Sequence, residues 1–211
     1  MINLFMPLYN AEAINIRTRI FGEADKIIIL FTKEYGKLQA IARGARRVTS
    51  KFGGRLEIFT YNKMLLAQGK NLDIISQCET IESFYTLREE KEKLNAGFYI
   101  VKLIDIITGE RQRNEELFNL LLENLFALQN VKDPKRLIRS FEVKLCEIEG
   151  FFPTKDMLGK INLSLPGIVK KLKGDDLEDL TDKELELSGS YFRELISDHT
   201  GKDIRRNQEY I

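Results

Sequence analysis

The sequence predicts an α+β protein of 211 residues, in which a small five-stranded β-barrel is followed by an all-α helical domain. Three observations lead to this class. Apolar residues alternate with a period of two through the first 80 residues, glycine-containing turns separate the alternating segments, and after Glu82 the period changes to 3.6. We therefore expect a barrel domain over residues 1–80 and a helical domain over residues 81–211.

Five short strands are expected in the first domain, at residues 13–21, 26–32, 37–43, 60–67 and 72–78. The first strand alternates cleanly, and we expect it to be half-buried with its arginines exposed. Its buried side would hold Ile14, Ile16, Thr18 and Ile20, and its exposed side Asn15, Arg17 and Arg19. Five strands without an intervening long helix indicate a small closed barrel. An SH3-like barrel is the competing architecture, and periodicity does not separate the two.

Two long helical segments are expected at the start of the second domain. Residues 84–107 are apolar nearly all round after Leu94, which is typical of a buried central helix, and residues 115–128 carry a leucine stripe. Asp133 followed by Pro134 predicts the start of a third helix, because aspartate caps helices and proline is favoured at the first helical position.

The ends of the later helices are also marked in the sequence. Gly150 is expected to end the third helix, as glycine commonly does. Residues 181–184 (TDKE) have the pattern of a capping box and predict a last helix toward His199, with Ser188–Ser190 weakening its middle. The single histidine, His199, is expected to cap the last helical turn.

The net charge of +1 hides an uneven distribution. Residues 1–80 hold 12 lysines and arginines against 7 acids, a balance of +5, whereas residues 81–211 have a balance of −4. Between Glu34 and Glu57 there is no acid at all, and the cations are Lys37, Arg43, Arg46, Arg47, Lys51 and Arg55. Such asymmetry indicates a basic binding module fused to a neutral or acidic one.

The sequence lacks the motifs that several classes of enzyme and metal-binding protein require. The chain has no phosphate-binding glycine loop, no dinucleotide-binding glycine motif, no nucleophile elbow and no paired metal histidines. Cys78 and Cys146 alone form neither a disulfide framework nor a four-cysteine zinc site, and each is expected to be buried as a small apolar residue. No apolar run is long enough to span a bilayer and no secretory signal is visible. We expect a cytoplasmic protein that is not an enzyme and has no cofactor or metal.

The acid-free segment has the chemistry of a phosphate-binding loop. A flexible loop bearing Arg43, Arg46, Arg47 and Lys51 could follow a nucleic-acid backbone, since cations that replace condensed counterions gain free energy. Arg17 and Arg19 would extend this surface. Single-strand binders add aromatic platforms, for which the candidates are Phe21, Phe52 and Tyr61, although a place in the core is favoured for each.

Three other interpretations stay open at this stage. The segment could be a basic surface loop without a ligand, the barrel could bind RNA, or the chain could be an adaptor whose basic loop docks an acidic protein tail.

Several segments resemble the RecO family of bacterial recombination-repair proteins. The resemblance is dense over residues 11–90 and continues through Gly150–Pro153 to a tail that holds Arg205 and Arg206. Its most specific stretches are Arg17–Lys26 (RTRIFGEADK), Leu30–Leu38 (LFTKEYGKL), Ala42–Arg47 (ARGARR) and Ser50–Phe52 (SKF).

The resemblance implies an N-terminal OB-fold and a C-terminal helical domain. It also implies binding of single- and double-stranded DNA, annealing of complementary strands, and cooperation with RecR in loading RecA onto DNA covered by single-strand-binding protein, whose C-terminal tail the helical domain grips in some members. Matching positions assign DNA contact to Arg17, Lys37, Arg43, Arg46, Arg47 and Lys51; charge alone adds Arg19 and Arg55. Many members carry a four-cysteine zinc module where Thr154–Pro166 has no cysteine, so we expect no zinc here.

Overall fold

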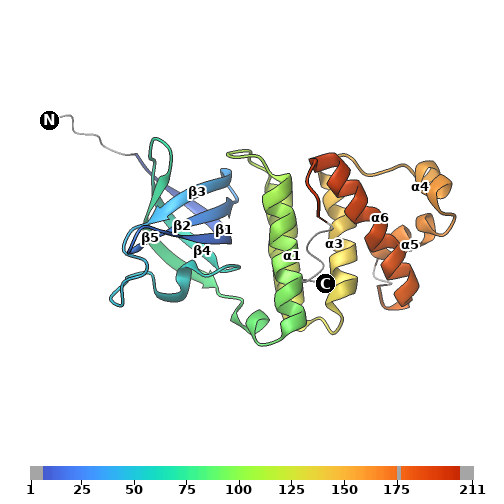
Figure 1. Ribbon diagram of the computed structural model, residues 1–211, viewed down its shortest axis with the longest axis horizontal. Coiled ribbons are helices and arrows are strands. Elements are labelled where there is room, and N and C mark those ends of the chain that lie inside the picture. Colours follow the sequence, from blue (N-terminus) through green and yellow to red (C-terminus); the bar gives the residue numbers. More distant parts are fainter. Residues whose placement is uncertain (1–6, 175–176, 205–211) are drawn as a thin grey trace. The chain divides into compact units, whose positions relative to one another are not determined.

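The structure is a computed structural model that describes residues 7–174 and 177–204 (Figure 1). Arg205 and Arg206, which belong to the family-like tail, lie outside the described residues, and so do Asp175 and Asp176.

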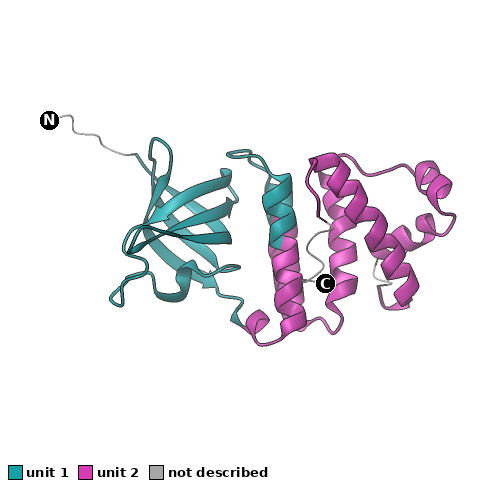
Figure 2. Cartoon of the chain, viewed as in Figure 1, with its two compact units in different colours: residues 1–85, 101–118 teal, residues 86–100, 119–211 magenta. Residues whose placement is uncertain are grey.

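The chain forms two compact units, each discontinuous in sequence (Figure 2). Unit 1 holds residues 1–85 with 101–118, and unit 2 holds residues 86–100 with 119–211. The second half of one helix therefore belongs with the barrel. The predicted boundary near residue 80 separates two domains that would each fold independently. The division into compact units does not test independent folding, so this boundary stays a prediction.

Unit 1 is built on a closed barrel in which the strands follow the order β1-β2-β3-β5-β4. All neighbours are antiparallel except β3 and β5, which pair in parallel through two residue pairs. This architecture confirms the predicted five-stranded barrel and is consistent with the OB-fold that the resemblance implies. The strands are β1 (Leu8–Phe21), β2 (Asp25–Thr32), β3 (Gly36–Ala42), β4 (Tyr61–Ala67) and β5 (Asp73–Glu82).

The barrel interior is filled by alternate residues of each strand, as the period of two predicts. Ile28, Leu30, Leu38 and Ala40 belong to this core. The intervening residues of β2 are buried as well, because the other face of that strand is also covered. Phe31, for example, is fully buried, and its ring lies 6.0 Å from that of Phe118.

The expected alternation of β1 is wrong at two positions. Asn15 is fully buried rather than exposed, and Ile20 is 67% exposed rather than buried. The pairing register with β2 shifts between Asn15 and Arg17, which is the effect of a bulge. Asn15 lies at this irregularity, and its buried side-chain amide donates to the carbonyls of Arg55 and Glu57. Arg17 and Arg19, which follow it, are exposed as predicted, and Ile20 lies next to the end of β1.

The segment that follows the first long helix is tied to the barrel within unit 1. Arg111 donates its backbone N–H to the Lys37 carbonyl (2.7 Å) and its guanidinium to the buried Asp73 (2.7 Å). Tyr9 also donates to Asp73. At Gly36 a Cβ would lie 2.0 Å from the Gln112 carbonyl oxygen, so only glycine allows this close approach. Residues 108–112 are therefore an integral part of the barrel unit.

Most of the remaining chain is helical, and the helices largely follow the predicted segments. The first long helix begins at Lys91 rather than at residue 84, because Phe84 has a positive φ of 49° and a 3-10 turn follows it. The elements are η2 (Tyr85–Arg88), α1 (Lys91–Ile107), α2 (Glu115–Asn130), α3 (Pro134–Ile148), α4 (Lys155–Ile161), α5 (Leu165–Lys173), η3 (Leu177–Asp179) and α6 (Asp182–Thr200).

The predicted start and end signals of α3 and the capping box of α6 are confirmed. Asp133 caps α3 by accepting from the Lys135 N–H, and Gly150 follows that helix with a left-handed φ of 76°. Thr181 and Glu184 form the capping box of α6. His199 lies in the last turn of α6, but the residue at the C-cap is Gly201, with a left-handed φ of 66°, and the histidine ring stacks on Phe151 at 3.9 Å.

The middle of α6 is continuous although its small residues predict a weak point. Within unit 2 Gly189 faces a buried charged cluster, in which Arg139 of α3 donates to Glu142 (2.5 Å) and Tyr99 donates to the same carboxylate (2.5 Å). A Cβ at Gly189 would lie 2.4 Å from the Arg139 guanidinium. The small residue is therefore required by packing between α3 and α6, which local helix propensity does not report.

Candidate nucleic-acid interface

The chain between β3 and β4 forms one structured segment, residues 43–56, which we call the basic loop. It includes the 3-10 turn η1 (Gly53–Leu56). Phe52 and Leu56 are buried in the barrel core. The side-chain amides of Asn15 and Asn62 both donate to the Arg55 carbonyl at 2.9 Å. These contacts fix the loop against the barrel, in place of the flexible loop that its composition predicts.

The first part of the basic loop is held by the turn between β1 and β2. The Gly44 N–H donates to the Asp25 carboxylate (2.7 Å), and the Arg46 N–H donates to the Ala24 carbonyl (2.9 Å). Gly44 has a φ of 69°, a conformation that glycine adopts without strain. The backbone beneath the arginines is therefore fixed before any ligand binds.

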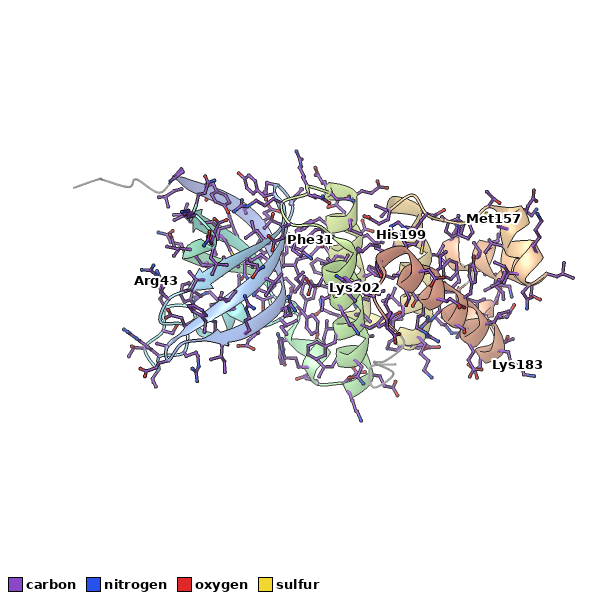
Figure 3. The ribbon with its side chains drawn as sticks, turned by 45° about the horizontal axis from the view of Figure 1, so that its top comes forward. Phe31, Arg43, Met157, Lys183, His199 and Lys202 are labelled. Carbon is purple, nitrogen blue, oxygen red and sulfur yellow. The ribbon has the colours of Figure 1, made fainter. Side chains whose placement is uncertain are left out.

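The cations of the basic loop are exposed: Arg43, Arg46, Arg47, Lys51 and Arg55. Figure 3 shows Arg43 directed away from the barrel. Within residues 7–174 and 177–204, none of the five forms an ion pair with a carboxylate.

Their hydrogen bonds go to backbone carbonyls instead. Arg46 donates to the carbonyls of Gly22 (3.3 Å) and Glu23 (2.9 Å), Lys51 to that of Ser76 (2.7 Å), and Arg55 to that of Lys51 (2.9 Å). A carbonyl orients a cation but does not neutralise it, so the positive charge of the loop remains available to an anion.

Two predicted site residues have a carboxylate partner within unit 1. Lys37 donates to Asp105 at both its backbone carbonyl (2.6 Å) and its side chain (3.2 Å), and only 13% of the lysine side chain is exposed. Arg17 pairs with the same carboxylate at 3.3 Å and stays 59% exposed. Asp105 lies in the last turns of α1, where cations are favoured by the helix dipole.

The eight predicted residues thus fall into separate groups. Lys37 is near the start of β3 and Arg43 just after its end, so their Cα atoms are about 20 Å apart at the usual strand rise. Along the strand direction Arg19 lies between Lys37 and Arg43, because its register through β2 places it level with Ile41 of β3. Its guanidinium donates to the Gln39 side chain (3.1 Å). The pairing with Asp105 has no local signal in the sequence, because the carboxylate follows Lys37 by 68 residues.

The three aromatic candidates differ in exposure. Phe52 and Tyr61 are buried, as expected for core residues, and Tyr61 donates its hydroxyl to Glu12. Phe21, at the end of β1, is 48% exposed.

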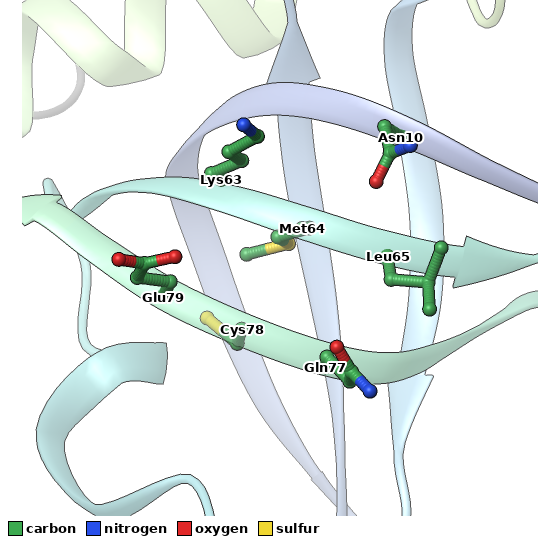
Figure 4. A pocket seen from close by; sticks show the side chains of 7 residues that line it. All are labelled: Asn10, Lys63, Met64, Leu65, Gln77, Cys78 and Glu79. Atoms are coloured by element: carbon green, nitrogen blue, oxygen red, sulfur yellow. The ribbon is translucent and has the colours of Figure 1, made fainter.

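A shallow pocket of about 210 Å³ lies on the outside of β1, β4 and β5 (Figure 4). Its charged side chains have opposite signs, Lys63 and Glu79, so it adds no net positive charge to the barrel surface. Cys78 also lines it, and burial raises the pKa of that thiol to about 11. The thiol is therefore protonated at neutral pH and is a poor nucleophile. This pocket is therefore not part of the candidate interface.

The described residues contain no helix with the length and apolarity needed to cross a bilayer. They also contain no cluster of three or more histidine, cysteine or acidic side chains placed to hold a metal ion. The cysteine-free segment Thr154–Pro166 forms α4 and the start of α5, and Thr154 caps α4 through its hydroxyl.

A closed five-stranded barrel that is followed in the chain by helices, and that presents a fixed cationic loop, defines the class of OB-fold proteins with an added helical region. Two family profiles match the chain: "Recombination protein O N terminal" over residues 6–84 and "Recombination protein O C terminal" over residues 88–156. The chain belongs to the RecO family.

Relatives named "DNA repair protein RecO" support this assignment. The one from Symbiobacterium thermophilum is 42% identical over 150 residues, which are 71% of this chain and 59% of the relative. The one from Pelotomaculum thermopropionicum is 38% identical over 162 residues, 77% of this chain and 63% of the relative. The one from Alkaliphilus metalliredigens is 37% identical over 147 residues, which are 69% of this chain and 60% of the relative. The chain thus matches about three fifths of the length of these curated relatives.

Proposed function

We propose that this chain is a DNA-binding and strand-annealing mediator of recombinational DNA repair. The observation that carries the proposal is the basic loop, in which five exposed cations without a carboxylate partner among the described residues stand on a fixed backbone. Membership of the RecO family supports the repair role, since the relatives bear the name of a DNA repair protein.

The proposed mechanism is electrostatic. Cations along one surface neutralise the phosphates of two strands together and release condensed counterions, so that the strands repel each other less and can pair. The cations contact the backbone, and complementary bases supply the specificity. This role needs no catalytic residue and no cofactor, which fits a protein that is not an enzyme.

The partners are also part of the proposal. By family membership the chain would act in the cytoplasm with RecR to help load RecA onto single-stranded DNA covered by single-strand-binding protein, and the helical region would hold that protein's acidic C-terminal tail. For the DNA contact itself we propose Arg43, Arg46, Arg47, Lys51 and Arg55 as the main set. Arg19 and Arg17 would be peripheral, and Lys37 would serve mainly to hold α1.

A salt titration tests the loop. In the full chain, replacing Arg43, Arg46 and Arg47 by alanine should weaken binding of fluorescent single-stranded DNA and lower the slope of log affinity against log salt by about 2, as expected when three phosphate contacts are lost. The matched control removes the same charge from unit 2, at the exposed lysines Lys155, Lys160 and Lys170. An unchanged slope in the arginine variant would refute the assignment of the loop.

The same assay separates the alternatives. Matched DNA and RNA oligonucleotides, with a strand-annealing assay, test whether RNA is the preferred ligand. Failure of the wild-type chain to retain any DNA at low salt would favour the adaptor, in which the basic loop docks an acidic protein tail.

A further inference from the structure

Phe21 is the aromatic candidate that the structure leaves accessible near the basic loop. It ends β1, pairs across the β1–β2 ladder with Asp25, and is 48% exposed. In the part of the chain that the structure describes, its ring stacks on no other aromatic ring. The neighbouring Ile20 is exposed too, so two consecutive apolar side chains face water at the end of this strand.

Phe21 is held beside the cations by the contacts of the loop. The two residues that follow it, Gly22 and Glu23, offer the carbonyls to which the Arg46 guanidinium donates. Asp25, its partner across the ladder, accepts the Gly44 N–H. An exposed aromatic ring and exposed guanidinium groups are therefore fixed at the same end of the barrel.

We propose that Phe21 is a stacking platform for an unpaired DNA base whose neighbouring phosphates contact Arg43 and Arg46. This inference rests on the proposed function and adds to it a means of selecting single strands. A phenyl ring stacks on any base and reads no hydrogen-bonding edge, so the site has little sequence preference. Bases of a duplex are already stacked on one another and are not free to reach the ring.

The charges around the ring set where the strand lies. Asp25 accepts from the Gly44 N–H but keeps its negative charge, and Glu23 is exposed in the turn, so both carboxylates repel phosphate. The phosphates would therefore lie over Arg43 and Arg46 rather than over the turn.

The test measures affinity for a single strand and for a duplex with the full-length chain. Phe21→Ala should weaken single-strand binding roughly five- to a hundredfold, the range for loss of one base–aromatic stack, and change duplex binding less than about twofold. The slope against salt should stay the same, because no charge is removed. Phe21→Leu keeps an apolar side chain without a ring and should weaken single-strand binding as alanine does.

A direct probe is available because the chain contains no tryptophan. Phe21→Trp introduces a single reporter, whose fluorescence should be quenched by a single strand that stacks on it and much less by a duplex. The matched control is Phe126 of α2, another exposed phenylalanine (43%), for which neither Phe126→Ala nor Phe126→Trp should show these effects.

The outcomes separate this inference from the proposed function. If the arginine variant loses affinity while Phe21→Ala binds single strands normally, the platform is wrong and the DNA-binding role stands. Full affinity in Phe21→Leu would also overturn stacking. If the wild-type chain binds no DNA at low salt, both proposals fall.

Discussion

Asp105 shows how one residue decides the role of two others. Its carboxylate and backbone carbonyl engage Lys37, and the carboxylate also pairs with Arg17. The pairing of Lys37 is mostly shielded from water, so its charge interaction is stronger than that of the exposed Arg17. Two residues that charge patterning assigns to DNA thus have a structural contact within unit 1.

Replacing Asp105 by asparagine should lower the free energy of unfolding by about 1–3 kcal/mol, because it leaves a largely buried ammonium group without its carboxylate. Urea unfolding of the full chain measures this. Glu123→Gln is the control, an exposed carboxylate of α2 whose loss should change stability by less than about 0.5 kcal/mol. Equal stability of the two variants would show that the Lys37 contact contributes nothing.

At the scale of elements, the packing of α6 on α3 depends on a glycine that local propensity counts against. Arg139 is 3% exposed and its guanidinium bonds Glu142, so it cannot move aside from Gly189 without breaking a buried ion pair. Burial raises the pKa of the Glu142 carboxyl, while the nearby Arg139 and the hydrogen bond from Tyr99 lower it. The cluster therefore depends on all its partners staying in place.

Gly189→Ala should destabilise the protein by about 1–3 kcal/mol, since a methyl group would overlap the Arg139 guanidinium. Gly167→Ala in α5 is the matched control: no atom lies within 4 Å of the added Cβ. There alanine should stabilise by about 0.4–1 kcal/mol through its higher helix propensity. Thermal unfolding of both variants checks the prediction, which fails if the two shift in the same direction.

At the scale of the whole molecule, the barrel unit does not end where the strands end. Phe118 packs on Phe31 and Tyr61, and Arg111 reaches the buried Asp73. Residues 101–118 therefore cover apolar side chains of the barrel and satisfy one of its buried carboxylates.

A fragment of residues 1–85 should consequently fail to fold by itself, because Phe31 would be exposed and Asp73 would lose its guanidinium partner. Far-UV circular dichroism and amide NMR spectra of the fragment, compared with those of the full chain, test this. A cooperative melt and dispersed amide signals would instead establish an independent domain that ends near residue 80.

The sequence-based predictions are correct where the interactions join residues that are close in sequence, and they fail where the partners are far apart in sequence. Asp133, Gly150 and the capping box at Thr181 are confirmed, because caps depend on atoms within about four residues along the chain. Asn15 is misplaced, because its side-chain amide is buried by hydrogen bonds to the carbonyls of residues 55 and 57, far along the chain. The set of DNA-contact residues stays a prediction.

The sequence by itself determined the barrel-then-helix order, the caps of α3 and α6, and the cationic segment between Glu34 and Glu57, since each is a periodic or local property of the chain. Only the tertiary structure decided which of those cations stay exposed, that Phe21 is accessible while Phe52 and Tyr61 are buried, and that residues 101–118 belong with the barrel. The physical reason is that ion pairing and burial depend on residues brought together from distant parts of the chain. Such contacts produce no periodic or local pattern in the sequence from which they could be predicted.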